Sequence, residues 1–206
     1  MIIDTNGIKH KKILITGQGR GGTSAIASIF YHLGYYMPDA SKLASMEDRT
    51  LQNMLMKDDI NGLIQELANR ERDWNLVAWK EPKLFSGNGL KLVDSLNKDW
   101  TYIIVFRDPY AIAYRNNISM GVDIDQALIH AANNNRKLAG FYEKTNKILP
   151  CYLVSYEKLI TKPDENLGKL LAYLGVSEPH LVLPELIDNL QQDKQRYLSV
   201  ADNNPD

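Results

Sequence analysis

A glycine-rich octet near the N-terminus is the part of the sequence best suited to bind an anion. It runs from Gly17 to Ser24 and reads GQGRGGTS, between an apolar run at 13–16 and apolar residues at helical spacing over 23–33. Glycines let the backbone turn tightly and bring its N–H groups close to a ligand, and the N-terminus of a following helix favours negative charge. A strand, a glycine turn and a helix in this order are typical of α/β nucleotide-binding folds.

Three hypotheses compete for this octet. In a phosphate loop of the G-x-x-x-x-G-K-[ST] type, Gly17 and Gly22 fit, but Thr23 stands at the lysine position. A dinucleotide fingerprint, G-x-G-x-x-G, also fits, but the acid expected about 20 residues further on would be Asp39, which follows a proline. In the third hypothesis Arg20 supplies a cation from within the loop, with two hydroxyl residues behind it. A tight turn without a ligand is the remaining alternative.

Charged residues also follow two other apolar runs that we expect to be strands. Lys80 and Glu81 follow one run, and Arg107 follows another. In open parallel sheets, ligands bind outside the carboxyl ends of the strands, so these side chains belong to the candidate site. Arg115 lies about two helical turns after Arg107, and two arginines there could clamp a phosphate away from the glycine loop. An ion pair of Arg107 with Asp108 is the structural alternative.

The pattern of apolar residues predicts strands that alternate with helices. We expect strands at 13–16, 76–79, 102–106 and 151–155, and helices at 23–33, 41–72 (with a break at Gly62), 90–96, 110–119, 125–144 and 166–174. This alternation predicts an α/β fold in three layers, a mainly parallel sheet with helices on both faces, as in P-loop NTPases. We expect residues 1–206 to form a single domain, with a core at about 12–176 and a loose polar tail at 191–206.

Composition narrows the classes of partner. The chain has 206 residues and a formal net charge of −1, which gives no overall attraction to nucleic acid or to anionic membranes. No run approaches the roughly 18 apolar residues of a membrane span. The single cysteine, Cys151, fits a reducing compartment. We therefore expect a cytoplasmic protein with no nucleic-acid partner and no membrane span, and the sequence leaves its oligomeric state open. No cluster of histidine, cysteine or carboxylate residues has metal-ligand spacing, so we expect no metal.

Four short motifs, taken in order, resemble the sulfotransferases that use 3′-phosphoadenosine 5′-phosphosulfate (PAPS). They are Gly19–Ser24, Trp79–Lys83, Phe106–Pro109 and Tyr156–Leu159. Their order and spacing are similar to the family from about residue 12 to residue 176, and the match looks closest to bacterial members that carry a W-K-D-P-R stretch. The resemblance implies a sulfotransferase that uses PAPS without a metal and acts on a hydroxyl or amine of a small-molecule or carbohydrate acceptor. A dinucleotide-binding oxidoreductase and a non-catalytic P-loop nucleotide-binding protein are the alternatives.

The resemblance also implies roles for individual residues. The 5′-phosphosulfate would bind to a loop that contains Gly19, Arg20, Gly21, Gly22, Thr23 and Ser24. Arg107 stands at the first position of the 3′-phosphate site, and Arg115 stands where the family usually has a serine. Tyr156 matches a tyrosine that lies against the nucleotide. Glu81 stands where relatives place the general base, and Lys80 would add positive charge beside Arg20.

Overall fold

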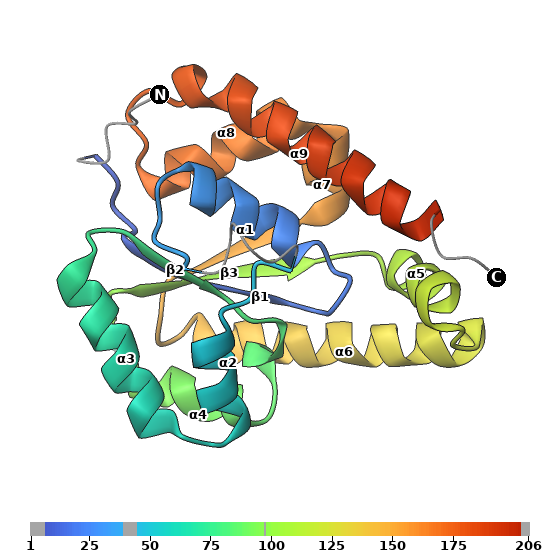
Figure 1. The fold of residues 1–206 in the computed structure, drawn as a ribbon, viewed down its shortest axis with the longest axis horizontal. Helices are drawn as coiled ribbons and strands as arrows, with labels where there is room; N and C mark the ends of the chain where they lie inside the picture. The colour runs from blue at the N-terminus through green and yellow to red at the C-terminus, as the bar shows by residue number, and fades with distance from the viewer. Residues whose placement is uncertain (1–6, 39–44, 97, 203–206) are drawn as a thin grey trace.

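The computed structural model describes residues 7–38, 45–96 and 98–202, with side chains described up to residue 190. Its centre is a sheet of four parallel strands in the order β2-β1-β3-β4 (Figure 1). The strands are β1 (Lys12–Gly17), β2 (Val77–Lys80), β3 (Trp100–Phe106) and β4 (Cys151–Ser155). Asp39, the acid considered for a dinucleotide site, and residues 41–44 of a predicted helix lie outside the described residues.

The strands are apolar on both sides, and this explains the two separate hydrophobic cores. Successive side chains of a strand point to opposite faces of the sheet. In β1, Ile13 and Ile15 therefore join one core and Leu14 joins the other. In β3, Ile103 belongs to the first core and Tyr102 to the second.

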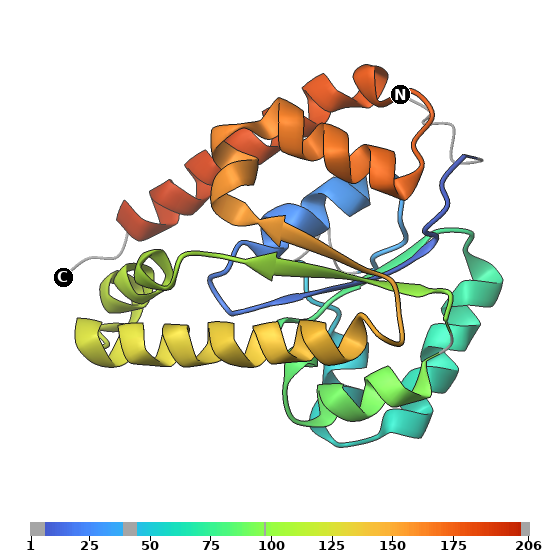
Figure 2. The same cartoon turned by 180° about the vertical axis from the view of Figure 1, so that it is seen from behind.

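Helices cover both faces of the sheet (Figures 1 and 2). One face carries α1 (Thr23–His32), α7 (Tyr156–Thr161), α8 (Pro163–Leu174) and α9 (Pro179–Asp202). The other carries α2 (Arg49–Met56), α3 (Ile60–Asp73), α4 (Asn88–Ser95) and α6 (Ile124–Thr145). The 3₁₀ helix η1 (Pro82–Phe85) follows β2, and α5 (Pro109–Met120) packs against α6. The predicted three-layer α/β fold with a parallel sheet is confirmed.

The break in the second helical region does not lie at Gly62. It lies at Asp58, whose φ is 59°, between α2 and α3. Asp59 caps α3, and its Oδ1 accepts a hydrogen bond from the backbone N–H of Gly62 at 2.9 Å. Gly62 therefore lies in the first turn of α3, where a Cβ atom would displace the capping carboxylate of Asp59 from its present position.

The C-terminal region also differs from the prediction. Helix α9, which the sequence analysis did not identify, buries Val182, Leu186 and Leu190 and continues to Asp202. We expected the tail to be loose from residue 191, but its backbone is helical as far as Asp202.

The order of the strands places the candidate residues at one edge of the sheet. The chain passes from β1 to β2 on one side and then returns to β3 on the other side of β1. The loops after β1 and β3 consequently meet at the point where the direction of the chain reverses, which is where ligands bind in open α/β sheets. Within the described part of the chain, no helix is sufficiently long and apolar to cross a membrane.

Candidate functional site

The glycine loop forms a tight turn that leads directly into α1. The N–H of Gly21 donates to the carbonyl of Gln18 at 2.9 Å, and the backbone is left-handed at Arg20 and Gly22, with φ of 63° and 88°. Gly22 is the N-cap of α1, and no side chain caps the helix. Because the first N–H groups of a helix have no partner within the helix, they are available to an anion here.

The glycine loop, the end of β3 and the start of α7 meet around one aromatic ring. A Cβ atom on Gly22 would overlap the ring of Tyr156. The guanidinium carbon of Arg107 lies 4.8 Å from the centre of the same ring, and its Nη1 donates to the carbonyl of Arg20 at 2.7 Å. The Nε of Arg107 is buried, and it makes no hydrogen bond among the described residues. It lies 3.9 Å from Glu157 Oε1, at ion-pair distance. A buried donor without a hydrogen bond is suited to a ligand oxygen.

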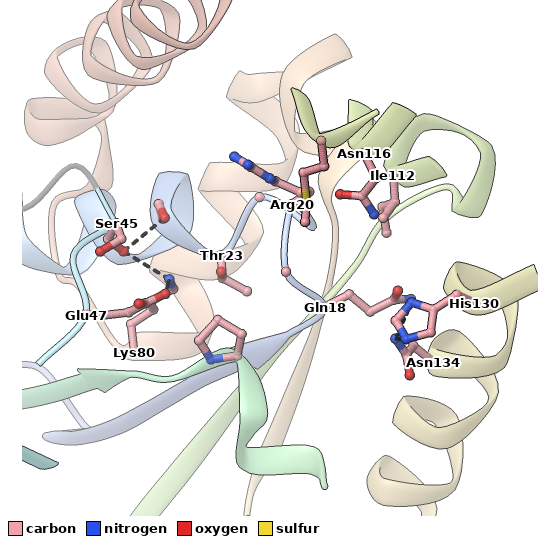
Figure 3. A pocket seen from close by; sticks show the side chains of 15 residues that line it. Gln18, Arg20, Thr23, Ser45, Glu47, Lys80, Ile112, Asn116, His130 and Asn134 are labelled. Carbon is pink, nitrogen blue, oxygen red and sulfur yellow. Dashed lines mark hydrogen bonds and ion pairs between the residues drawn. The ribbon is translucent and has the colours of Figure 1, made fainter. Parts of the chain in front are cut away.

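A cavity of about 360 Å³ opens beside the glycine loop (Figure 3). Its described lining comes from the loop, from the segment that precedes α2, from the end of β2, and from α5 and α6. The lining residues are Gln18, Gly19, Arg20, Gly22, Thr23, Ser24, Ser45, Glu47, Lys80, Pro82, Ile112, Asn116, Met120, His130 and Asn134.

One side of the cavity is charged and strongly hydrogen-bonded. The Lys80 side chain is only 3% exposed, and its Nζ donates to the carbonyl of Ser45 at 3.0 Å and pairs with Glu47 Oε1 at 2.6 Å. The hydroxyl of Ser24 donates to the same Ser45 carbonyl at 3.0 Å. Among the described lining residues, Glu47 is the only carboxylate. Lys80 and Ser24 thus already have partners, which an anionic ligand would replace or share.

The opposite side of the cavity carries neither carboxylate nor ammonium groups among its described residues. It is formed by Ile112, Asn116 and Met120 of α5 and by His130 and Asn134 of α6. These positions recur every four residues in each helix, so they lie on the helix faces that line the cavity. Figure 3 shows His130 and Asn134 across the cavity from Lys80 and Glu47.

The structure does not bring Glu81 to the cavity. Its side chain is 1% exposed, and its two oxygens accept hydrogen bonds from the backbone N–H of Lys83 at 2.9 Å and from Gln52 Nε2 at 3.0 Å. Burial raises the pKa of Glu81, although these two hydrogen bonds oppose the shift. The carboxylate caps η1, and Glu81 is not among the described residues that line the cavity.

The remaining predicted residues fall into two groups. Gly19, Arg20, Gly22, Thr23, Ser24 and Lys80 line the cavity, whereas Gly21, Arg107, Arg115 and Tyr156 are not among the described lining residues. Arg115 lies half-buried on α5, and its partnership with Arg107 stays a prediction.

Sequence reasoning did not identify Glu47, His130 or Asn134 as site residues. The helical spacing of His130 and Asn134 was a usable signal, whereas nothing in the local pattern marked Glu47. Among the residues that the structure describes, no group of three or more histidine, cysteine or carboxylate residues could hold a metal ion.

Comparison with known proteins places this geometry in a structural class. No protein-family model and no curated protein sequence matches the chain. A sulfotransferase domain from the olefin synthase of Synechococcus PCC 7002 superposes with a TM-score of 0.57 at 18% identity, over 88% of this chain and 80% of that one. A sulfotransferase domain from the curacin biosynthetic pathway gives a TM-score of 0.50 at 18% identity, over 82% and 74%.

The fold is therefore that of sulfotransferase domains. The resemblance carried by the four motifs is confirmed at the level of the fold.

Proposed function

We propose that this protein is a sulfotransferase that moves a sulfuryl group from PAPS to a hydroxyl or amine of an acceptor. One observation carries the proposal. The uncapped N-terminus of α1 and the glycine loop form an anion site, and the half-buried Arg107 lies against that loop with a buried Nε that makes no hydrogen bond among the described residues. A nucleotide with an anionic group at each end requires two such sites side by side.

The contacts support separate roles for these two sites. We assign the 5′-phosphosulfate to the N–H groups of the glycine loop and to Arg20, with the hydroxyls of Thr23 and Ser24 behind them. We assign the 3′-phosphate to Arg107, and Arg115 remains a candidate for the same group. A guanidinium matches the geometry of a phosphate through paired hydrogen bonds. Tyr156, which already packs against Gly22 and Arg107, would lie beside the nucleotide.

Sulfuryl transfer requires in-line placement of the acceptor and positive charge on the oxygens that become more negative. The acceptor oxygen forms a bond to sulfur while the bond from sulfur to the phosphate oxygen of the donor breaks. The leaving group is adenosine 3′,5′-bisphosphate. Arg20, the loop N–H groups and Lys80 would stabilise the charge that it gains, and one such preorganised donor is typically worth about 3–4 kcal/mol.

We propose Glu47, rather than Glu81, as the group that accepts the proton of the acceptor hydroxyl. A general base must be within hydrogen-bond reach of that proton, and Glu47 lines the cavity whereas Glu81 is enclosed by its own hydrogen bonds. Lys80 holds Glu47 when no anion is bound. An anionic donor would compete for Lys80 and leave the Glu47 carboxylate available to the acceptor.

The wall of α5 and α6 supports an acceptor without strong negative charge. Its carboxamide groups, on Asn116 and Asn134, can both donate and accept hydrogen bonds with hydroxyl groups, and Ile112 and Met120 offer an apolar surface. We propose that the acceptor is a small molecule or carbohydrate bound against this wall.

Binding in the presence of EDTA tests the donor assignment. Calorimetric titration with adenosine 3′,5′-bisphosphate should show binding that does not require magnesium. Arg20→Ala should weaken binding of PAPS or slow transfer by roughly a hundredfold, the effect of one lost charge-stabilising donor. Arg72→Ala is the matched control because Arg72 is exposed and pairs only with Asp73 among the described residues.

Two outcomes would replace the proposal with one of its alternatives. Magnesium-dependent ATP binding that is insensitive to Arg20→Ala would identify a P-loop nucleotide-binding protein. Binding of NAD at comparable concentration would identify a dinucleotide-binding protein.

A further inference from the structure

One side chain of the glycine loop points away from the turn and into α6. Gln18 is 4% exposed, and its Nε2 donates to the backbone carbonyl of Ala131 at 2.9 Å and also to Oδ1 of Asn135. Figure 3 shows the Gln18 side chain extending from the loop toward the helix that carries His130 and Asn134. No phosphate-binding role requires a long carboxamide here, since the backbone of the loop provides the donors.

Asn135 extends this contact to the end of β3. While its Oδ1 accepts from Gln18, its Nδ2 donates to the backbone carbonyl of Arg107 at 3.0 Å. Arg107 donates in turn from Nη1 to the carbonyl of Arg20 at 2.7 Å. The hydrogen bonds form a closed ring that passes from the loop to α6, to the end of β3 and back to the loop.

This ring has the properties of a rigid spacer. Gln18 is buried and Asn135 is half-buried, and each carboxamide donates to a backbone carbonyl of another element, so these hydrogen bonds favour a single arrangement of the loop, α6 and the end of β3. The ring joins the backbone of Arg107 to the loop that contains Arg20. It also fixes α6, so that His130 and Asn134, the neighbours of Ala131 and Asn135 in sequence, face the cavity.

We propose that Gln18 and Asn135 are positioning residues that hold the glycine loop and Arg107 at the separation at which one nucleotide can occupy both. The proposal rests on the proposed function. A ligand with two anionic groups gains from the second group only if both sites are held in advance at the matching distance. Neither residue needs to touch the nucleotide to produce this gain.

The test is the ratio of two affinities, those for adenosine 3′,5′-bisphosphate and for adenosine 5′-phosphate, measured by calorimetry on the full chain. The two ligands differ only in the 3′-phosphate, so their ratio reports that group alone. Arg107→Ala, which removes the assigned contact, sets the scale of the loss. Gln18→Leu and Asn135→Leu should each lower the ratio by roughly tenfold, because a displacement of about 1 Å is enough for an effect of that order or larger.

Two further variants separate positioning from general destabilisation. Asn88→Leu removes a comparable carboxamide-to-carbonyl hydrogen bond, from Asn88 Nδ2 to Leu55 at 2.9 Å, between α4 and α2. It should lower the melting temperature and leave the ratio unchanged. Asn135→Asp keeps the acceptor for Gln18 and loses the donor to Arg107, but it also adds a negative charge near the assigned phosphate site. A lowered ratio in this variant therefore supports positioning only together with a lowered ratio in the uncharged Asn135→Leu, which serves as the test if Gln18→Leu does not fold.

Coupling between the two residues gives an independent readout. If they act through one chain of hydrogen bonds, the Gln18→Leu/Asn135→Leu double variant should lose little more of the ratio than the more damaging single variant. An unchanged ratio in Gln18→Leu and Asn135→Asp, with a lowered ratio in Arg107→Ala, would overturn the positioning role and leave the proposed function intact. A wild-type protein with no preference for the bisphosphate would overturn both.

Discussion

Lys80 and Glu47 form the ion pair that governs the charge of the cavity. A lysine that is 3% exposed is stable as a cation only with a partner, and Glu47 Oε1 at 2.6 Å provides it. The pair brings one positive and one negative charge to a site that would receive an anionic donor. The donor and Glu47 therefore compete for Lys80, which links donor binding to release of the carboxylate.

Because of this competition, Glu47→Gln should slow transfer without weakening nucleotide binding. Transfer should fall by roughly a hundred- to ten-thousand-fold, the usual contribution of a general base. Affinity for adenosine 3′,5′-bisphosphate should stay the same or rise, because a negative charge beside the anion site has been removed. Initial rates of bisphosphate release from PAPS, with an acceptor found by screening hydroxyl compounds, and calorimetric titration measure the two effects.

Glu81→Gln is the matched control for this prediction. It makes the same chemical change at a carboxylate that does not line the cavity, so transfer should stay within a few-fold of wild type. Collapse of turnover in Glu81→Gln together with normal turnover in Glu47→Gln would return the role of the base to Glu81.

The different positions of Lys80 and Glu81 could have been anticipated from the sequence. Consecutive residues at the end of a strand point to opposite sides, so a lysine directed into the cavity turns the following carboxylate away from it. Glu47 could not have been anticipated, because the predicted helix at 41–72 included its position, whereas the structure has no helix at residues 45–48 and α2 begins only at Arg49. Its position depends on the tertiary hydrogen bonds of Ser45 to Ser24 and Lys80.

At the scale of elements, local pattern predicted the helices better than their contacts. The predicted helix at 125–144 is α6, at 124–145, but nothing local indicated that Gln18 and Asn135 would join it to the glycine loop. Helix α9 had a usable signal, since Val182, Leu186 and Leu190 recur every four residues and are buried. The internal Pro184 and the polar residues beyond position 190 obscured it.

The junction of the glycine loop with α7 leads to a prediction for Gly22→Ala. An alanine at φ of 88° has an unfavourable backbone conformation, which costs roughly 1–2 kcal/mol, and its Cβ would also overlap the ring of Tyr156. The ring must therefore move, and the Arg107 guanidinium above it loses its support. We expect a lower free energy of unfolding and weaker binding of adenosine 3′,5′-bisphosphate.

Gly34→Ala separates these two causes. Gly34 has nearly the same backbone angle, φ of 85°, but a Cβ there would meet nothing within 4 Å. Urea unfolding of both variants should show a larger loss for Gly22→Ala, and only that variant should lose nucleotide affinity. Equal losses of stability would mean that the contact between Gly22 and Tyr156 contributes nothing.

At the scale of the whole molecule, the order of the strands is what makes a site from separate motifs. The sequence predicted four strands and the charged residues at their carboxyl ends. It did not predict the order β2-β1-β3-β4, which makes β1 and β3 neighbours. The register between them is set by long-range pairing, such as Thr16 with Ile104 and Gly17 with Val105. Pairing between residues so far apart in sequence depends on the packing of both cores, which local patterns do not specify.

The stability of the whole molecule should respond to pH through Glu81. Burial raises its pKa in the folded protein above the ordinary value of 4.5, with the nearby Glu47 acting in the same direction and Lys80 opposing it. The folded state therefore holds this proton to higher pH than the unfolded state does. Linkage then requires the contribution of Glu81 to the free energy of unfolding to fall as pH rises from about 4.5 through the folded-state value, and to stay constant above it.

Glu81→Gln removes this dependence while keeping the shape of the side chain. The difference in free energy of unfolding between Glu81→Gln and wild type should increase in favour of the variant as pH rises from 4 to 8 and then level off, as measured by urea unfolding at each pH. Glu165→Gln is a suitable control, because Lys169 lowers the pKa of Glu165 and its contribution should change in the opposite direction. A wild type that instead gains stability over Glu81→Gln with rising pH would mean that the hydrogen bonds from Lys83 and Gln52 outweigh burial. The ionised Glu81 carboxylate would then increase the free energy of unfolding and not decrease it.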